Sequence, residues 1–366
     1  MNSTESHDDT PSARVDLTKL VPLALEALQR MFICDQDLFC YREKRLGDRL
    51  LLEGLSVRYT AITLIGLVSA QQHGVKIPFN LERLAQRLHR ATESGLGDLG
   101  LISWGLSLQW PILAQQIAGT LKYKIDANAL AVLNPMELSW LLIGLCMLYR
   151  SGVSRDETLV HDTAYVLLST HETRTGLFYR TTPGVRSVIR PLASFAMHIY
   201  PIYALAIYAE TFQRMALLAP AQACAERLCV LQLSDGGWPW MYDVRTGSVV
   251  DPYPVYSVHQ DGMAPMALLK LTQVGGYDFS VAIERGIRWL QQNNALKARM
   301  IDEKWHTIWR AQEVPRVFGF QARLMVNAVS ALLLKRAGIT IGPMKIVAEC
   351  RPYHLGWLLH AVYLGV

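Results

Sequence analysis

The sequence predicts an all-α protein folded as a single α/α toroid, in which an inner ring of helices is wrapped by an outer one. Three observations predict this fold. A turn motif recurs along the chain with anchors at residues 172, 232 and 294, and amphipathic segments alternate with segments that are apolar nearly all round. Hydrophobic residues make up 51% of the 366 residues and charged residues only 18%. Such a repeated unit must stack on its neighbours to bury its apolar face.

The turn motif is clearest in LQLSDGGWPW, residues 231–240, where Gln232 is followed by Gly236 and Trp238. Glycine at this place can end a helix in the left-handed conformation, with the aromatic ring folded over the last turn. The upstream copy has Glu172, Gly176 and Phe178, and the downstream copy has Asn294 with Trp305 displaced outward. We expect these turns to lie on the outer rim of the toroid.

Each turn motif follows an amphipathic segment, which is typical of a helix with one exposed face. The predicted outer helices are TLVHDTAYVLLST (158–170), PAQACAERLCVLQL (220–233) and FSVAIERGIRWLQQNN (279–294). Uniformly apolar segments alternate with them and are expected to be fully buried helices. The predicted inner helices are 56–70, 98–109, 137–148, 194–210, 255–271, 318–336 and 352–364. The pattern therefore predicts six or seven helical hairpins.

We expect residues 1–14 to form a disordered polar tail and residues 15–366 to form one domain, because no linker divides the repeats. The tail has mixed charges and no apolar core, unlike a signal peptide. The apolar segments are too short or too interrupted to span a membrane. The six cysteines lack metal-type spacing, which favours a reduced, cytoplasmic compartment. The net charge of +5 shows no basic stripe for nucleic acid.

The turn at Gln232, Gly236 and Trp238, followed by Arg285-Gly286-x-x-Trp289-Leu290, resembles the QW repeat of squalene–hopene cyclases. By this resemblance the chain is similar to the terpene cyclase/prenyltransferase toroid superfamily. The resemblance implies a class II-type, protonation-initiated cyclase acting on an isoprenoid or an isoprenylated aromatic substrate. The chain lacks the Asp-x-Asp-Asp signature of those enzymes, so a different acid would have to serve. The motif residues are structural in that family and are therefore not catalytic candidates here.

In a toroid the N-termini of the inner helices surround one mouth of a central cavity. Polar residues stand at most of these predicted starts: Arg58, Tyr59, Asp98, Glu137, His198, His259, Asp261, Arg323, Tyr353 and His354. Any one of them alone is more often a helix cap or a satisfied core residue. Their convergence predicts a functional mouth.

Asp98 is the sharpest catalytic candidate, because glycines and leucines surround this lone carboxyl group. In an apolar cavity the pKa of a carboxyl group rises, which would leave a protonated acid able to protonate an alkene. Tyr59, His198 or His259 would orient or reprotonate it, and Glu137 is the alternative acid. Aromatic rings would stabilise the resulting cations. The predicted substrate-binding residues are Trp104, Trp140, Tyr200, Tyr203, Tyr256, Phe318, Phe320, Arg323, His354 and Trp357.

We expect no zinc and no other cofactor, because the chain lacks the Asp-x-Cys pair of protein prenyltransferases and a complete DDxxD motif. The strongest alternative is a carbohydrate-active toroid: a polysaccharide lyase, uronyl epimerase or glycosidase. Such enzymes use Tyr, His and Arg for proton transfer and carboxylate neutralisation. A third possibility is a non-catalytic toroid that binds a lipid, whose sign would be Asp98 and the histidines closed off by salt bridges. The low charge also predicts an exposed apolar patch for peripheral membrane contact near the cavity entrance.

Overall fold

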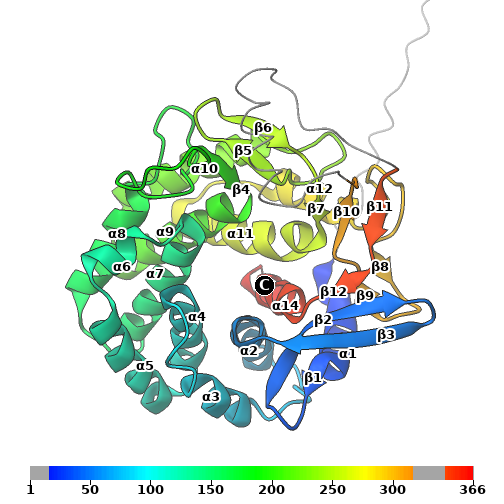
Figure 1. Cartoon of the computed structure of the whole chain (residues 1–366), viewed down its shortest axis with the longest axis horizontal. Helices are drawn as coiled ribbons and strands as arrows, with labels where there is room; N and C mark the ends of the chain where they lie inside the picture. The colour runs from blue at the N-terminus through cyan, green and yellow to red at the C-terminus, as the bar shows by residue number, and fades with distance from the viewer. Residues whose placement is uncertain (1–15, 316–342, 366) are drawn as a thin grey trace, which may run out of the picture.

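The computed structural model describes residues 16–315 and 343–365. It confirms the single α/α toroid that the sequence predicts (Figure 1). Six helices of the described residues form the inner ring, and each contacts the next, with α14 closing the circle between α11 and α2. The inner helices are α2 (Val57–Gln72), α4 (Leu96–Ser107), α7 (Pro135–Arg150), α9 (Ala196–Phe212), α11 (Ala264–Gly275) and α14 (Pro352–Leu364).

The outer layer consists of helices that pack on the inner ring and bury fewer of their residues than the inner helices do (Figure 1). Its main helices are α1 (Val21–Met31), α3 (Leu81–His89), α5 (Pro111–Lys124), α8 (Glu157–Leu168), α10 (Ala219–Leu231) and α12 (Ser280–Trp289). Short helical turns complete it: η1 (Leu17–Leu20), α6 (Ala127–Ala131) and η2 (Met215–Leu218). The predicted inner helix 318–336 lies outside the described residues.

Glycines let the inner helices approach one another closely. A Cβ atom at Gly66 would lie 2.1 Å from the carbonyl oxygen of Gly356, so only glycine fits between α2 and α14. Likewise, a Cβ atom at Gly144 would lie 2.3 Å from the carbonyl oxygen of Gly100, between α7 and α4. The glycines that interrupt the apolar segments of the sequence are therefore helix-crossing points of a tightly packed ring.

The repeated turns connect neighbouring outer helices. Gly176 and Gly236 have φ of +76° and +92°, and a Cβ atom would lie 2.7 Å from the carbonyl oxygen of Ala223 and 2.2 Å from that of Arg285. The Gln232 side chain donates hydrogen bonds to the carbonyl oxygens of Gly236 and Ala282, at 2.8 and 2.9 Å. Each turn is thus clamped against the outer helix of the next repeat.

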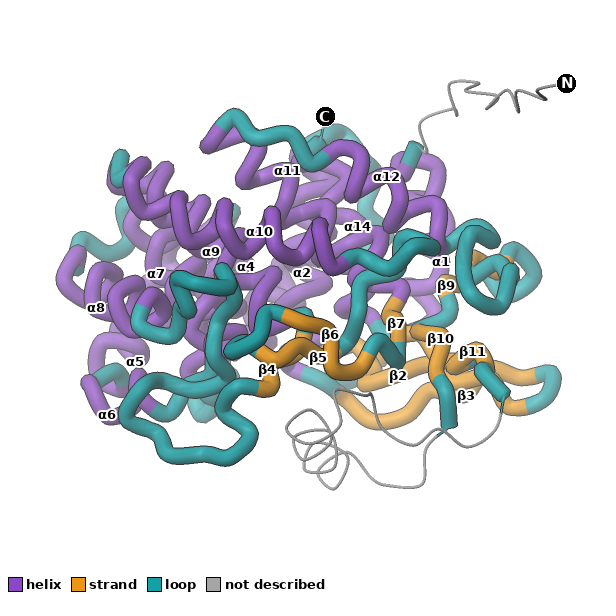
Figure 2. The backbone as a smooth tube through the Cα atoms, turned by 90° about the horizontal axis from the view of Figure 1, so that it is seen from above, coloured by secondary structure: helices purple, strands orange, loops and turns teal. Residues whose placement is uncertain are grey.

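Short antiparallel strands gather on the face where the inner helices begin (Figure 2). Several lead directly into an inner helix: β3 into α2, β4 into α9, β12 into α14, and β7 into a π-helical turn, η3 (His259–Met263), that continues as α11. The strands are β1 (Phe32–Ile33), β2 (Leu38–Leu46), β3 (Arg49–Leu55), β4 (Leu192–Ser194), β5 (Met241–Asp243), β6 (Ser248–Asp251), β7 (Val255–Tyr256), β8 (Ile301–Asp302), β9 (Thr307–Ile308), β10 (Ala311–Glu313), β11 (Lys345–Val347) and β12 (Glu349–Cys350).

Two of the small sheets carry residues to the mouth of the ring. One has the order β1-β2-β12, and β3 also pairs with β2, along a segment that includes the two residues paired with β12. The second has the order β11-β10-β7. Cys350 of β12 lies opposite Glu43 of β2, although more than 300 residues separate them in the sequence. These pairings join the two ends of the chain beside the start of α14.

Candidate functional site

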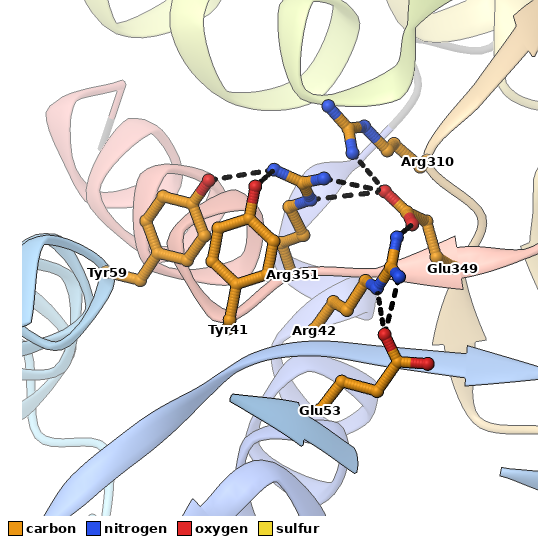
Figure 3. A network of polar contacts seen from close by, with 7 residues as sticks. All are labelled: Tyr41, Arg42, Glu53, Tyr59, Arg310, Glu349 and Arg351. Carbon is orange, nitrogen blue, oxygen red and sulfur yellow. Dashed lines mark hydrogen bonds and ion pairs between the residues drawn. The ribbon is translucent and has the colours of Figure 1, made fainter. Parts of the chain in front are cut away.

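The centre of the mouth is a network of charged and aromatic side chains around Arg351, the residue that precedes α14 (Figure 3). Its guanidinium donates hydrogen bonds to the hydroxyls of Tyr59, at 2.8 Å, and Tyr41, at 3.0 Å. It also lies 4.5 Å from the ring centroid of Tyr41, which stacks on Tyr59 with a centroid distance of 5.3 Å. Arg351 is therefore held by aromatic rings as well as by hydrogen bonds.

Glu349 is the anionic hub of this network. Its carboxylate pairs with Arg351 at 3.0 Å, with Arg42 at 2.9 Å and with Arg310 (Figure 3). Burial would raise the pKa of Glu349, but the adjacent guanidiniums, Arg310 foremost, hold it below its usual value. Arg42 also pairs with Glu53 at 2.5 Å. Among the described residues, three guanidiniums of this network thus share two carboxylates, which leaves one positive charge in excess for an anionic ligand.

Tyr353 stands next to this excess charge, in the first turn of α14. Its ring lies 4.6 Å from that of Tyr59, and in the described part of the structure no hydrogen bond holds its hydroxyl. Burial raises the pKa of Tyr353 above its ordinary value, while Arg310 and Arg351 oppose that shift. Tyr353 is therefore a neutral phenol at physiological pH, placed where two cations and a helix N-terminus would stabilise the phenolate.

Arg58 and Asp98 lie in the first turns of the neighbouring inner helices α2 and α4. The two side chains pair at 2.5 Å, and the Arg58 guanidinium lies 5.1 Å from the ring centroid of Trp140. Burial lowers the pKa of Arg58, but the hydrogen bond and charge of Asp98 raise it above its usual value. Tyr200 packs on Trp140 at 5.3 Å and on Trp357 of α14 at 5.9 Å.

A third group comes from β5–β7 and η3. The His259 ring packs on Phe195 at 4.4 Å and is nearly parallel to Trp240, at 6.3 Å with 9° between the two planes. Burial lowers the pKa of His259 to about 3, so the imidazole is neutral, and its Nδ1 has no hydrogen-bond partner among the described residues. Tyr256 packs against His259 and faces Arg310, whose guanidinium lies 5.0 Å from its ring centroid.

Below the mouth, aromatic side chains fill the ring. Trp104 packs on Tyr203 and on Trp357, each at 5.4 Å, and Trp357 packs on Tyr200 at 5.9 Å. None of these rings, nor that of Trp140, is more than 3% exposed. Because the walls of a substrate-sized cavity would expose surface to water, these rings form a packed core. They do not line the deep apolar chamber that an isoprenoid would need.

A buried ion pair lies behind Tyr353. His354 Nε2 contacts both carboxylate oxygens of Asp261, at 2.8 and 2.9 Å, and joins the start of α14 to the π-helical turn η3. Burial lowers the pKa of His354, but the carboxylate of Asp261 more than reverses this and raises it to about 10. His354 is therefore a buried cation of the framework, not a residue that lines the mouth.

The structure brings several of the predicted site residues together and separates others from them. Tyr59, Asp98 and Tyr256 lie at the mouth, and His259 is buried beside Tyr256. Trp140 and Tyr200 belong to the packed aromatic core below it. Asp98 pairs with Arg58 and not with the expected partners, so it is not the free acid that we predicted. Glu137 forms a capping box with Asn134 at the start of α7. Phe318, Phe320 and Arg323 lie outside the described residues.

His198 has a structural position that the sequence did not indicate. It is fully buried, and its Nδ1 accepts a hydrogen bond at 3.2 Å from the backbone N–H of Phe178, in the preceding turn motif. Burial lowers its pKa to about 3. This imidazole ties the turn to α9 and makes no contact with Asp98.

Sequence reasoning missed the four residues that carry the charge of the mouth, Arg42, Arg310, Glu349 and Arg351, and also Tyr41, which packs on Arg351. They lie on or beside strands β2, β10 and β12, which the helical pattern did not predict. The one available signal was Arg351, because Arg-Pro-Tyr directly precedes a buried helix.

No family model matches the sequence, and no curated protein matches it. Solved structures share its fold. A sugar epimerase from a ruminal bacterium matches with a TM-score of 0.63 and 11% identity, covering 95% of this chain and 98% of its own. An unsaturated glucuronyl hydrolase from Streptococcus agalactiae matches with a TM-score of 0.63 and 11% identity, covering 99% and 96%. A possible member of the GH105 family from Klebsiella pneumoniae gives 0.60 and 12%, covering 100% and 98%.

These neighbours correct the predicted family and function. They are glycoside hydrolases and a sugar epimerase, not terpene cyclases, so the resemblance to QW repeats and the class II cyclase mechanism are wrong. The expected hydrophobic isoprenoid substrate is wrong with them, since a packed aromatic core lies where its chamber would be. The peripheral membrane contact stays a prediction. Within residues 16–315 and 343–365 no helix is long and apolar enough to cross a membrane. At this low identity the comparisons establish the fold of the chain.

Proposed function

We propose that this protein is a carbohydrate-active enzyme that binds a uronate-containing saccharide at the mouth formed by the starts of its inner helices. The observation that carries the proposal is the Arg351–Arg310 pair, which has one unbalanced positive charge and lies among tyrosine rings. Guanidiniums bind carboxylates through paired hydrogen bonds, and aromatic rings offer flat apolar faces to sugar rings. The fold neighbours, named as glucuronyl hydrolases and a sugar epimerase, support the same substrate class.

Arg351 and Arg310 would bind the uronate carboxylate, which places the sugar ring beside Tyr353. A neutral phenol can donate a proton to a glycosidic oxygen or to a ring carbon, and the two guanidiniums would stabilise the phenolate that forms. The Asp98 carboxylate, held by Arg58, would accept hydrogen bonds from sugar hydroxyls.

The test is turnover of uronate oligosaccharides in D₂O, followed by NMR and mass spectrometry, with wild type and Tyr353→Phe. A hydrolase creates new reducing ends, a lyase creates an unsaturated uronate, and an epimerase exchanges the proton next to the carboxylate for deuterium. We expect one of these products from wild type and a loss of about 10²–10⁴-fold in the variant. Full activity of Tyr353→Phe would refute its role as the proton donor.

One observation favours a non-catalytic toroid. The Arg58–Asp98 and Asp261–His354 pairs close off four of the predicted polar residues, which is the sign expected of a binding protein. The Tyr353 hydroxyl, which has no hydrogen-bond partner among the described residues, argues for chemistry instead. Binding of a uronate saccharide without any turnover, under conditions where the saccharide saturates the protein, would favour the non-catalytic protein.

A further inference from the structure

The outer edge of β3 combines unpaired backbone with exposed leucines, which is unusual for the surface of a monomeric protein. β3 pairs with β2 along one side, and in the described part of the chain no strand pairs with its other side. Its sequence, RLLLEGL, exposes 42% of Leu51, 41% of Leu52 and 46% of Leu55. An apolar strand edge without proline or lysine is a ready template for another strand.

The sequence of this strand is complementary to itself. When two copies run antiparallel with Leu51 facing Leu51, Arg49 of each copy lies opposite Glu53 of the other, and Leu50 lies opposite Leu52. Shifting the register by two residues in either direction moves Arg49 away from Glu53. Opposite charges directly across two strands stabilise their pairing, and like charges oppose it. The strand therefore favours a two-fold symmetric partner in one register.

Glu53 connects this edge to the mouth. It pairs with Arg42 of its own chain, and Arg42 pairs with Glu349, the carboxylate shared with Arg310 and Arg351 (Figure 3). In the self-paired strand, Glu53 would lie between Arg42 of its own chain and Arg49 of the second copy. The row of alternating charges, from Arg42 through Glu53 to Arg49 of the second copy, would then cross the interface between the two copies.

We propose that the protein forms a two-fold symmetric dimer in which β3 pairs with β3 of a second copy, with Leu51 at the axis and Arg49 opposite Glu53. The strand that pairs with this edge is expected to be β3 of a second copy, because the edge carries apolar residues at its centre and opposite charges at its two ends. An anionic membrane would not require Glu53, and an unrelated strand would not require this symmetry. The dimer is independent of the proposed function, since it rests on the strand alone.

The test measures the mass of the full chain by sedimentation velocity, over a range of concentrations. Wild type is expected to sediment at twice 41.1 kDa. Arg49→Glu places two carboxylates opposite each other at both ends of the paired strands, and Glu53→Arg places two guanidiniums there, so each variant alone is expected to be monomeric. An equimolar mixture of the two variants restores opposite charges at both ends and is expected to dimerise. Circular dichroism checks that each variant is folded.

Leu51→Lys provides a second reading in case Glu53→Arg disturbs its own hairpin through Arg42. It places two lysines face to face at the axis and should also give a monomer. Leu46→Lys is the matched control, because Leu46 is 65% exposed on β2 of the same hairpin and lies away from the free edge. It should remain a dimer. A wild type that stays monomeric overturns the proposal, and so does a dimer that survives Arg49→Glu and Leu51→Lys.

Discussion

The buried Asp261–His354 pair makes a sharp prediction about stability. The two side chains are 0% and 4% exposed, and the imidazole contacts both carboxylate oxygens. Asp261→Asn keeps the shape of the side chain and removes its charge. Breaking a buried pair on one side costs about 3–5 kcal/mol, because the remaining group loses its partner in a site without water. We expect a loss of that size in the free energy of unfolding near neutral pH.

The pair also fixes the direction of the pH dependence. The pKa of His354 is raised from 6.5 to about 10 in the folded protein. A raised pKa stabilises the fold fully below pH 6.5, and this contribution declines as pH rises towards 10. Wild type should therefore become less stable between about pH 6.5 and about pH 10, while this part of the decline is absent from Asp261→Asn.

Urea unfolding followed by circular dichroism, at several pH values across this window, measures both effects. Glu303→Gln is the control, because it removes the exposed Arg299–Glu303 pair and should leave unfolding unchanged within error. Equal stability of Asp261→Asn and wild type near neutral pH would refute the account of this pair. A variant that retains the wild-type decline with pH would show that another group titrates.

Three further changes probe the framework and the mouth. Gly236→Ala should lower the free energy of unfolding by more than about 1–2 kcal/mol, because φ is +92° and the added methyl meets the carbonyl oxygen of Arg285. An unchanged melting temperature would show that the turn can move away and would refute this prediction. Trp238→Ala should cost about 3–5 kcal/mol, since the ring is fully buried against Phe195, and it should leave substrate binding intact in calorimetry. Arg58→Gln should lower the free energy of saccharide binding by more than it lowers the free energy of unfolding. Equal losses in the two free energies would assign Arg58 a structural role.

Much of the fold could be predicted because the inner helices carry a local signal. The predicted segments 137–148 and 352–364 correspond to α7 and α14, and the glycines within them mark the crossings of the ring. The same local signal misled the family assignment. Gly176 and Gly236 are required by a left-handed φ and by the close approach of the next outer helix. Any toroid with this spacing imposes that requirement, so the turn motif reports geometry and not chemistry.

The candidate site was only partly predictable, because its charges come from distant parts of the chain. Glu349 pairs with Arg42 and Arg310 only after β12 has paired with β2 and β10 has paired with β11. No periodicity in the sequence marks such partners. Asp98 illustrates the same limit, since its position at the start of α4 was predicted but its neutralisation by Arg58, 40 residues earlier, was not. Helix patterns placed the mouth, and tertiary pairing determined its chemistry.

The central claim is that the mouth recognises a carboxylate on a sugar. The most direct test is calorimetric titration with a uronate oligosaccharide and with the same oligosaccharide after reduction of its carboxyl groups, using wild type and Arg351→Gln. Hydrogen bonds to charged groups contribute about 1.5–3 kcal/mol, so wild type should prefer the uronate form by about 10–100-fold, and Arg351→Gln should lose that preference. Equal affinity of wild type for the two forms, or an undiminished preference in Arg351→Gln, would contradict the account.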